Sequence, residues 1–218
     1  MNAAPAPEDQ PREPRVPRVK VCGVTSVEDA LGCVEAGVDL LGVNFIASSP
    51  RRVHPADARR ITEAVRGRAE VAGVVADEDE AALRRLRDEV GLDWLQLHGD
   101  EPPALLDALA PFAFKALRIG DAGDAARAAI YGGAMLLLDA RVAGLLGGTG
   151  KAVDTALAAP IARLRRVILA GGLRPENVAA AVRAVRPWGV DAASGVESAP
   201  GVKDLTKVAA FVEGARSA

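Results

Sequence analysis

The feature that most constrains the fold is a regular alternation of short apolar runs and helical patterns along the chain. Each unit has a β-branched or apolar run, a turn with Gly or Asp, and a helical pattern. The strand-like runs begin near Arg18, Val38, Glu70, Asp93, Phe112, Ala134, Arg166 and Gly189. The helical patterns cover about residues 27–36, 55–66, 80–90, 102–110, 122–131, 153–164, 175–185 and 203–214. Eight such units in about 200 residues predict an α/β fold, a single (β/α)8 TIM barrel, with a doubly wound open sheet as the alternative.

Composition narrows the partners that such a chain can have. The 27 Lys and Arg residues are balanced by 29 Asp and Glu residues, so there is no basic excess to attract nucleic acid. The longest apolar runs, such as residues 135–138, are far shorter than the roughly 18 to 20 residues of a membrane span. We therefore expect neither nucleic acid nor a membrane as partner.

The two cysteines and the N-terminal segment bear on location and domain organisation. Cys22 and Cys33 form no disulfide framework, which favours a reducing, cytoplasmic setting. Residues 1–17 combine five prolines with charged residues and contain no apolar stretch typical of a signal peptide. We interpret them as a short disordered extension, followed by one barrel domain over residues 18–218.

The ends of the predicted strands are where a barrel of this kind carries its chemistry. In the first strand, alternation places Val19 and Val21 on the face toward the helices, and Lys20 and Cys22 inside the barrel. Cys22 is then a candidate functional residue at the mouth, beside a cation, although a buried, inert role is the commoner fate of a free cysteine. Cys33 lies within a helical pattern and is expected to be structural.

Two further polar residues end apolar strands. Asp139 follows a run of leucines at the end of the sixth strand, where it is either a functional carboxyl group or a turn residue. His98 ends the fourth strand, and His54 is the only other histidine, so a metal site with several histidine ligands cannot form. We expect no metal. The glycine-rich segment 147–151 does not fit a P-loop and is predicted to be a mobile loop over the site.

Glycine turns and an arginine loop indicate an anionic ligand. Turns with Gly171, Gly172 and Leu173, and with Ser194 and Gly195, follow the seventh and eighth strands, where barrel enzymes commonly bind phosphate through backbone amides. Tight turns without a ligand are the alternative. The loop after the second strand carries Arg51 and Arg52, which either bind a substrate carboxylate or form a solvated basic loop.

Nine short motifs then occur in order along the chain. They are KVCGVT at 20–25, EDA at 28–30, SPR at 49–51, QLHGDE at 96–101, LLD at 137–139, GGTGK at 147–151, LAGGL at 169–173, PENV at 175–178, and SGVE at 194–197 with PG at 200–201 and KD at 203–204. Together they resemble the phosphoribosylanthranilate isomerase family. The resemblance implies a barrel that catalyses the third step of tryptophan synthesis from chorismate, an Amadori rearrangement of a small phosphorylated substrate without a cofactor.

The resemblance also implies a role for each matched residue. Cys22 would be the general base, Asp139 the general acid and Arg51 the ligand of the anthranilate carboxylate. Phosphate would lie on the loops with Gly171, Gly172, Leu173, Ser194 and Gly195, and the supporting residues would be Lys20, His98 and Asp191. We expect the site to lower the pKa of Cys22, helped by Lys20 unless that lysine pairs with Asp191 instead.

Several other functions fit the same fold. A histidine-pathway isomerase, or an enzyme that serves both pathways, would normally have Asp at the position of Cys22. A ribulose-phosphate epimerase would need metal ligands, and a catalytically silent ligand-binding barrel would not need both Cys22 and Asp139. The sequence leaves open whether the chain is a monomer or a homodimer.

Overall fold

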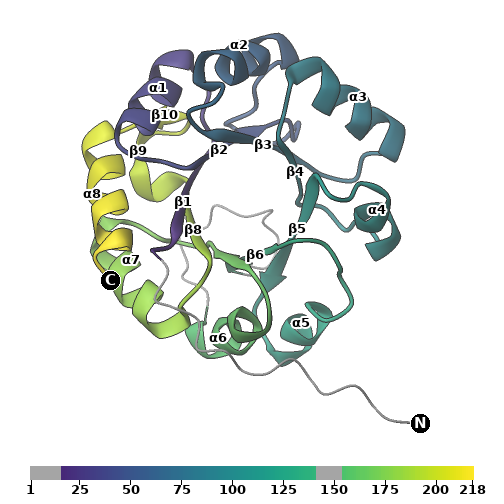
Figure 1. Ribbon diagram of the computed structural model, residues 1–218, viewed down its shortest axis with the longest axis vertical. Coiled ribbons are helices and arrows are strands. Elements are labelled where there is room, and N and C mark those ends of the chain that lie inside the picture. Colours follow the sequence, from purple (N-terminus) through teal and green to yellow (C-terminus); the bar gives the residue numbers. More distant parts are fainter. Residues whose placement is uncertain (1–15, 141–153) are drawn as a thin grey trace.

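Eight parallel strands close into a barrel in the order β1 to β8, and the main helices lie outside it (Figure 1). The structure is a computed structural model that describes residues 16–140 and 154–218. Closure confirms the predicted TIM barrel, and the open-sheet alternative is wrong. The predictions for the N-terminal extension, apart from residues 16 and 17, and for the loop at 147–151 lie outside the described residues.

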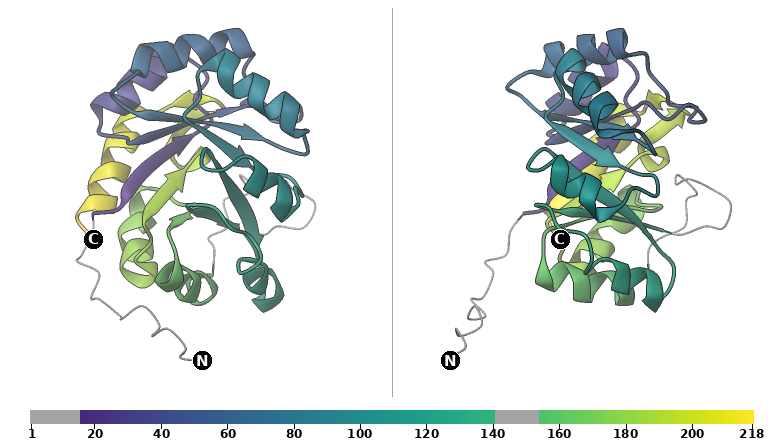
Figure 2. Two further views of the ribbon diagram at one scale, coloured as in Figure 1. Left: turned by 45° about the vertical axis from the view of Figure 1, so that its right-hand side comes forward. Right: turned by 90° about the vertical axis from the view of Figure 1, so that its right-hand side faces the viewer.

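The observed elements follow the predicted alternation closely. The barrel strands are β1 (Arg18–Cys22), β2 (Leu40–Asn44), β3 (Glu70–Val75), β4 (Trp94–Leu97), β5 (Ala113–Ile119), β6 (Leu136–Ala140), β7 (Val167–Leu169) and β8 (Gly189–Ala192). The α-helices are α1 (Val27–Glu35), α2 (Pro55–Val65), α3 (Glu80–Val90), α4 (Pro103–Ala108), α5 (Ala122–Arg127), α6 (Thr155–Leu164), α7 (Pro175–Val185) and α8 (Leu205–Arg216). Seen from the side, the helices form an outer layer around tilted strands (Figure 2).

Strand alternation divides the core into two parts. Val19 and Val21 belong to the large cluster between the strands and the helices, as predicted. A smaller cluster fills the inside of the barrel with Leu40, Ala72, Phe114, Ala116, Met135, Leu137, Ile168 and Ala170. Lys20 lies opposite Asp191 in the register between β1 and β8. The barrel is therefore closed by a pair of strands that carry opposite charges at the same level.

The connection between β8 and α8 contains structure that the sequence analysis did not predict. A short 3-10 helix, η1 (Ser194–Val196), leads into an antiparallel hairpin of β9 (Glu197–Ala199) and β10 (Val202–Lys203). Gly201 allows the tight turn because its φ angle is +84°. The following helix begins at Leu205 rather than near residue 203, because the Asp204 side chain caps it. The hairpin lies beside α1 and α8 (Figure 1).

Candidate active site

The predicted site residues come together at one end of the barrel. In a closed parallel barrel, the carboxyl ends of all strands share one rim. Cys22 is the last residue of β1, Asp139 lies one residue before the end of β6, and His98 directly follows β4. The loop with Arg51 follows β2. The predicted phosphate-binding turns follow β7 and β8. The arrangement joins a thiol, a carboxyl group, a guanidinium and two glycine turns around one mouth.

Cys22 owes its place to the absence of a side chain on the neighbouring strand. A Cβ atom at Gly42 would lie 2.8 Å from the Cys22 Sγ atom and 3.1 Å from the Lys20 Nζ atom. Burial raises the pKa of the Cys22 thiol, and the charge of Asp191 raises it further, while Lys20 and Lys203 lower it. The net effect is a raised pKa. The predicted lowering of this pKa is therefore wrong, because burial outweighs the nearby cations.

Lys20 and Asp191 form a buried ion pair inside the barrel. The Lys20 Nζ atom lies 3.0 Å from the Asp191 Oδ1 atom, and both side chains are almost inaccessible to solvent. Burial lowers the pKa of Lys20, but the charge of Asp191 opposes it, and the pKa lies above its usual value. Lys20 thus pairs with Asp191, the alternative considered from the sequence, and is not free to stabilise a thiolate alone.

Asp139 and His98 face each other inside the mouth. Both residues are buried, and the His98 Nε2 atom lies 3.9 Å from the Asp139 Oδ2 atom. Burial, followed by the charge of Lys115, lowers the pKa of His98 to about 4, so the ring is neutral at pH 7. The Gln96 Nε2 atom lies 3.0 Å from the His98 Nδ1 atom. With the Gln96 amide donating, the ring proton is on Nε2 and points toward Asp139.

The two predicted phosphate turns touch each other. Gly171 and Gly172 have φ angles of +86° and +59°, a backbone conformation that only glycine adopts easily. A Cβ atom at Gly195 would collide with the carbonyl oxygen of Leu173, so the turns after β7 and β8 are in direct contact. The Asn177 side chain accepts from the Arg174 amide and donates to the Gly172 carbonyl oxygen. Among the described residues, the amides of Gly172, Leu173, Ser194 and Gly195 make no hydrogen bond to a backbone carbonyl oxygen.

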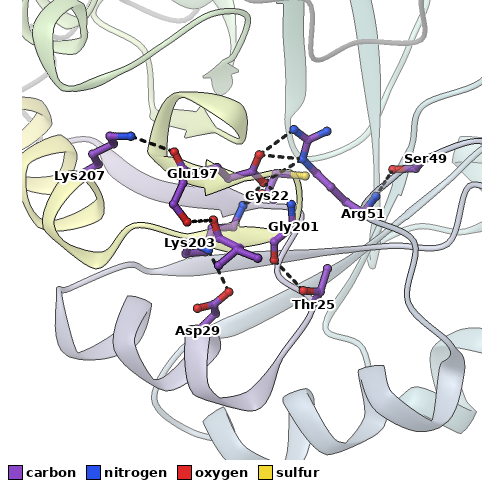
Figure 3. A network of polar contacts seen from close by, with 11 residues as sticks. Cys22, Thr25, Asp29, Ser49, Arg51, Glu197, Gly201, Lys203 and Lys207 are labelled. Carbon is purple, nitrogen blue, oxygen red and sulfur yellow. Dashed lines mark hydrogen bonds and ion pairs between the residues drawn. The ribbon is translucent and has the colours of Figure 1, made fainter.

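Arg51 is held by a residue to which the sequence analysis gave no role. Its Nε and Nη2 atoms donate to the Glu197 carboxylate at 2.8 and 2.7 Å (Figure 3). The same carboxylate accepts from Lys203 Nζ at 2.7 Å. The interpretation of Arg51 as part of a solvated loop is therefore wrong. Glu197 and Lys203 were missed because they belong to the unpredicted hairpin, although opposite charges on either side of a Pro-Gly turn are a signal for it.

Two kinds of feature are absent from the residues that the structure describes. They contain no group of three or more His, Cys, Asp or Glu side chains placed to hold a metal ion. Across 16–140 and 154–218, no helix has the length and apolar character needed to cross a membrane.

The closed barrel and its mouth define an enzyme of the (β/α)8 class. Residues 19–214 match the family model described as N-(5'phosphoribosyl)anthranilate (PRA) isomerase. An N-(5'-phosphoribosyl)anthranilate isomerase of Roseiflexus castenholzii is 47% identical over 210 residues, which cover 92% of this chain and 98% of the relative. The chain belongs to this family of isomerases.

Solved structures agree with this membership. The phosphoribosyl anthranilate isomerase of Thermus thermophilus has a TM-score of 0.83 and 40% identity, and the match covers 92% of this chain and 98% of that one. A second phosphoribosyl anthranilate isomerase was solved in complex with reduced 1-(o-carboxyphenylamino)-1-deoxyribulose 5-phosphate. It has a TM-score of 0.82 and 35% identity, with 93% of this chain and all of that chain covered.

Proposed function

We propose that this chain catalyses the Amadori rearrangement of N-(5-phosphoribosyl)anthranilate to 1-(2-carboxyphenylamino)-1-deoxyribulose 5-phosphate, in tryptophan synthesis. The observation that carries the proposal is the placement of Cys22 and Asp139 on β1 and β6 of a barrel of this family. A reaction that breaks a C–O bond and moves a proton from carbon needs one acid and one base. These two residues supply both.

The first step of the proposed mechanism belongs to Asp139. Its protonated carboxyl group donates a proton to the ring oxygen of the ribose while the bond between that oxygen and C1 breaks. The nitrogen lone pair forms the C1=N double bond, which leaves a cationic iminium. His98 stands next to this carboxyl group as a neutral ring, so it adds no charge that would favour the carboxylate, and at 3.9 Å its Nε2 atom is too far away to donate a hydrogen bond that would.

The second step belongs to Cys22. Its thiolate removes the proton from C2, and the electrons of the C–H bond form a C1=C2 double bond and neutralise the nitrogen. The resulting enol-amine then becomes the amino ketone product by proton transfer from the enol oxygen and to C1. Because burial raises the pKa of Cys22, the reacting enzyme is the fraction whose thiol has released its proton to water, and the positive charge of the iminium favours this thiolate form.

Substrate binding uses the two remaining parts of the mouth. The amides of Gly171, Gly172 and Leu173 and of Ser194 and Gly195 bind the phosphate group. Arg51 binds the anthranilate carboxylate through the Nη1 group that Glu197 leaves unoccupied. Lys20 and Asp191 support the strand that carries Cys22. Each step is a proton transfer, so no cofactor takes part.

Two substitutions test the acid and the base. Cys22→Ala and Asp139→Asn should each lower kcat by about 10² to 10⁴, the usual contribution of a positioned acid or base. Fluorescence of the anthranilate group follows turnover, and circular dichroism checks the fold. The matched control is Cys33→Ala, because Cys33 lies on the buried face of α1 in the outer core and its substitution should leave kcat nearly unchanged. A Cys22→Ala enzyme with more than about a tenth of the original kcat would contradict the mechanism.

The substrate is tested in cells. The gene should restore growth of a tryptophan auxotroph that lacks this isomerase, and it should not restore a histidine auxotroph that lacks the related barrel isomerase. Growth of the second strain would add the histidine-pathway substrate to the proposal. Failure of the first would remove the proposed substrate.

A further inference from the structure

The carboxylate of Glu197 is the centre of a buried polar network at the rim (Figure 3). It accepts from Nε and Nη2 of Arg51, from Nζ of Lys203 and from the amide of Gly201. The side chain is 4% exposed. Burial raises the pKa of Glu197, but the bonds from Arg51 and Lys203 lower it more, so the group stays ionised. A charged group this deeply buried remains only because its partners are fixed around it.

The partners of Glu197 lead directly to the proposed base. The Lys203 Nζ atom, which is fully buried, donates to Glu197 at 2.7 Å and to the backbone carbonyl oxygen of Cys22 at 2.7 Å. One carboxylate thus connects the residue assigned to the substrate carboxylate with the strand end that carries the thiol. The path runs from Arg51 through Glu197 and Lys203 to Cys22.

The hairpin that carries Glu197 is itself fastened to the start of the barrel. The Lys203 amide donates to Asp29 in α1 at 3.0 Å, and the Thr25 hydroxyl donates to the Gly201 carbonyl oxygen at 2.7 Å. From α8, the Lys207 Nζ atom donates to the Glu197 carbonyl oxygen at 2.9 Å. The hairpin is therefore bonded both to the start of the barrel and to α8, and from this fixed position Glu197 contacts Arg51.

The charges in the network do not cancel. Arg51 and Lys203 bring two positive charges and Glu197 brings one negative charge, which leaves a net charge of +1. Lys203 is enclosed, whereas the Arg51 side chain is 16% exposed. The Arg51 side chain also passes over Gly23, where any Cβ atom would collide with it. The uncompensated charge is thus presented to the mouth by the Arg51 guanidinium in one orientation.

We infer that Glu197 is a positioning residue for substrate recognition: it fixes the Arg51 guanidinium so that the remaining Nη1 group meets the substrate carboxylate. The inference rests on the proposed role of Arg51. Glu197 itself does not touch the substrate. Its removal should therefore weaken binding of a carboxylated substrate and have little effect on a substrate without the carboxylate.

The experiment compares two substrates in three variants. The substrates are N-(5-phosphoribosyl)anthranilate and N-(5-phosphoribosyl)aniline, which differ only in the carboxylate. The variants are Glu197→Gln, Arg51→Ala and the double variant. Glu197→Gln should raise KM for the anthranilate substrate about tenfold or more, and change KM for the aniline substrate by less than about twofold. Arg51→Ala should behave in the same way, and the double variant should be little worse than Arg51→Ala alone.

A matched control separates positioning from general damage. Glu101 is also a buried glutamate paired with a lysine, with 3.0 Å between its Oε2 atom and the Lys115 Nζ atom. In the described chain it makes no contact with Arg51. Glu101→Gln should therefore change KM for both substrates by the same factor. If Glu197→Gln fails to fold, Glu197→Asp takes its place, because a side chain shorter by one CH₂ group cannot hold Arg51 and Lys203 together.

The outcomes distinguish this inference from the proposed function. Equal changes of KM for both substrates in the Glu197 variant, with the expected discrimination kept in Arg51→Ala, would overturn the positioning role alone. Equal changes in Arg51→Ala would overturn the carboxylate assignment and, with it, the route by which Glu197 acts. Additive effects in the double variant would also overturn the inference, since they would show that Glu197 acts independently of Arg51.

Discussion

At the scale of single residues, burial decides which protonation states the mouth of the barrel holds. His98 has a pKa lowered to about 4, because an imidazolium would lose its hydration there and would face the charges of Lys115 and Arg118. Cys22 has a raised pKa for the same first reason. In both groups burial favours the neutral form. The charges that remain buried at the mouth are those with a partner, such as Lys20 with Asp191.

The buried neutral histidine predicts a loss of stability in acid. The unfolded chain binds a proton at His98 near pH 6.5, whereas the folded chain does so only near pH 4. Between these values the unfolded state holds more protons, so the free energy of unfolding falls as the pH falls. This difference of pKa corresponds to a loss of about 3 kcal/mol, complete near pH 4 and absent above about pH 6.5.

The variant His98→Gln should remove this contribution. Urea denaturation of the original and variant proteins at about pH 7 and about pH 4.5 gives the two pH dependences. The original protein should lose about 2 to 3 kcal/mol more than the variant over this interval. Carboxylates such as Glu197 contribute equally to both proteins and cancel in the difference. An equal loss of unfolding free energy in both proteins would mean that His98 is already protonated in the folded state at about pH 4.5.

At this scale, strand alternation explains why the sequence predicts which residues lie inside the barrel. It placed Lys20 and Cys22 inside the barrel and Val19 outside, and the register then brought Lys20 opposite Asp191. The partner of Arg51 could not be predicted in this way. Glu197 follows it by 146 residues, and no local pattern reports a contact over that separation. The raised pKa of Cys22 also depends on burial, which only the folded barrel determines.

At the scale of elements, contact between the turns after β7 and β8 makes Gly195 sensitive to substitution. A Cβ atom there would collide with the Leu173 carbonyl oxygen, so Gly195→Ala must push the two turns apart. If their amides bind phosphate together, KM should rise about tenfold or more while kcat changes less. Inhibition by inorganic phosphate should weaken in parallel. Unchanged inhibition would place the phosphate elsewhere on the barrel.

The control for this prediction is Gly67→Ala. Gly67 also has a positive φ angle, +74°, but lies between α2 and β3 at the opposite end of the barrel. A Cβ atom added to Gly67 would have no atom of the described chain within 4 Å, apart from its immediate neighbours. Its substitution should lower stability by about 1 kcal/mol through backbone strain and leave KM unchanged. The comparison separates a strained backbone from a displaced phosphate turn.

The elements most visible in the sequence were the long, periodic ones. Helices such as α2 and α3 were predicted within a residue or two of their ends, since their amphipathic pattern repeats over three turns. The β9 and β10 strands, with three and two residues, are too short to show alternation. Their local signals are the turn at Pro200 and Gly201 and the opposite charges of Glu197 and Lys203 on either side of it. The hairpin is held by long-range bonds: the Lys203 amide donates to Asp29 in α1, and the Lys203 side chain donates to the Cys22 carbonyl oxygen in β1.

At the scale of the whole molecule, the ion pair of Lys20 and Asp191 joins the first barrel strand to the last. Asp191→Asn should destabilise the fold by about 3 to 5 kcal/mol, because it leaves the Lys20 charge buried without a counter-ion. The double variant Lys20→Met with Asp191→Asn should recover most of this loss. Urea unfolding of both single variants and the double variant measures the coupling. Additive losses of stability would show that the ion pair does not stabilise the pairing of β1 with β8.

Closure itself follows from the number of repeated units rather than from any one of them. The eight barrel strands and the helices that follow them could be predicted locally, and eight units of this size favour a barrel over an open sheet. No local sequence pattern predicts the pairing of β1 with β8, because the paired residues Lys20 and Asp191 are 171 residues apart in the chain. The family motifs predicted which loops converge at the rim, because the motifs mark that end of the barrel.

The contact between Arg51 and Glu197 also sets the order in which the mouth is finished during synthesis. A ribosome adds about 5 to 20 residues per second, and 146 residues separate the two side chains. About 7 to 30 s therefore pass between the addition of Arg51 to the nascent chain and the addition of Glu197. The rim is completed only after α8 has also been synthesised, because Lys207 of α8 donates to the Glu197 carbonyl oxygen. A truncated product of translation that stops before the hairpin would carry Cys22 and Arg51, yet would lack Glu197 and Lys203, which link them.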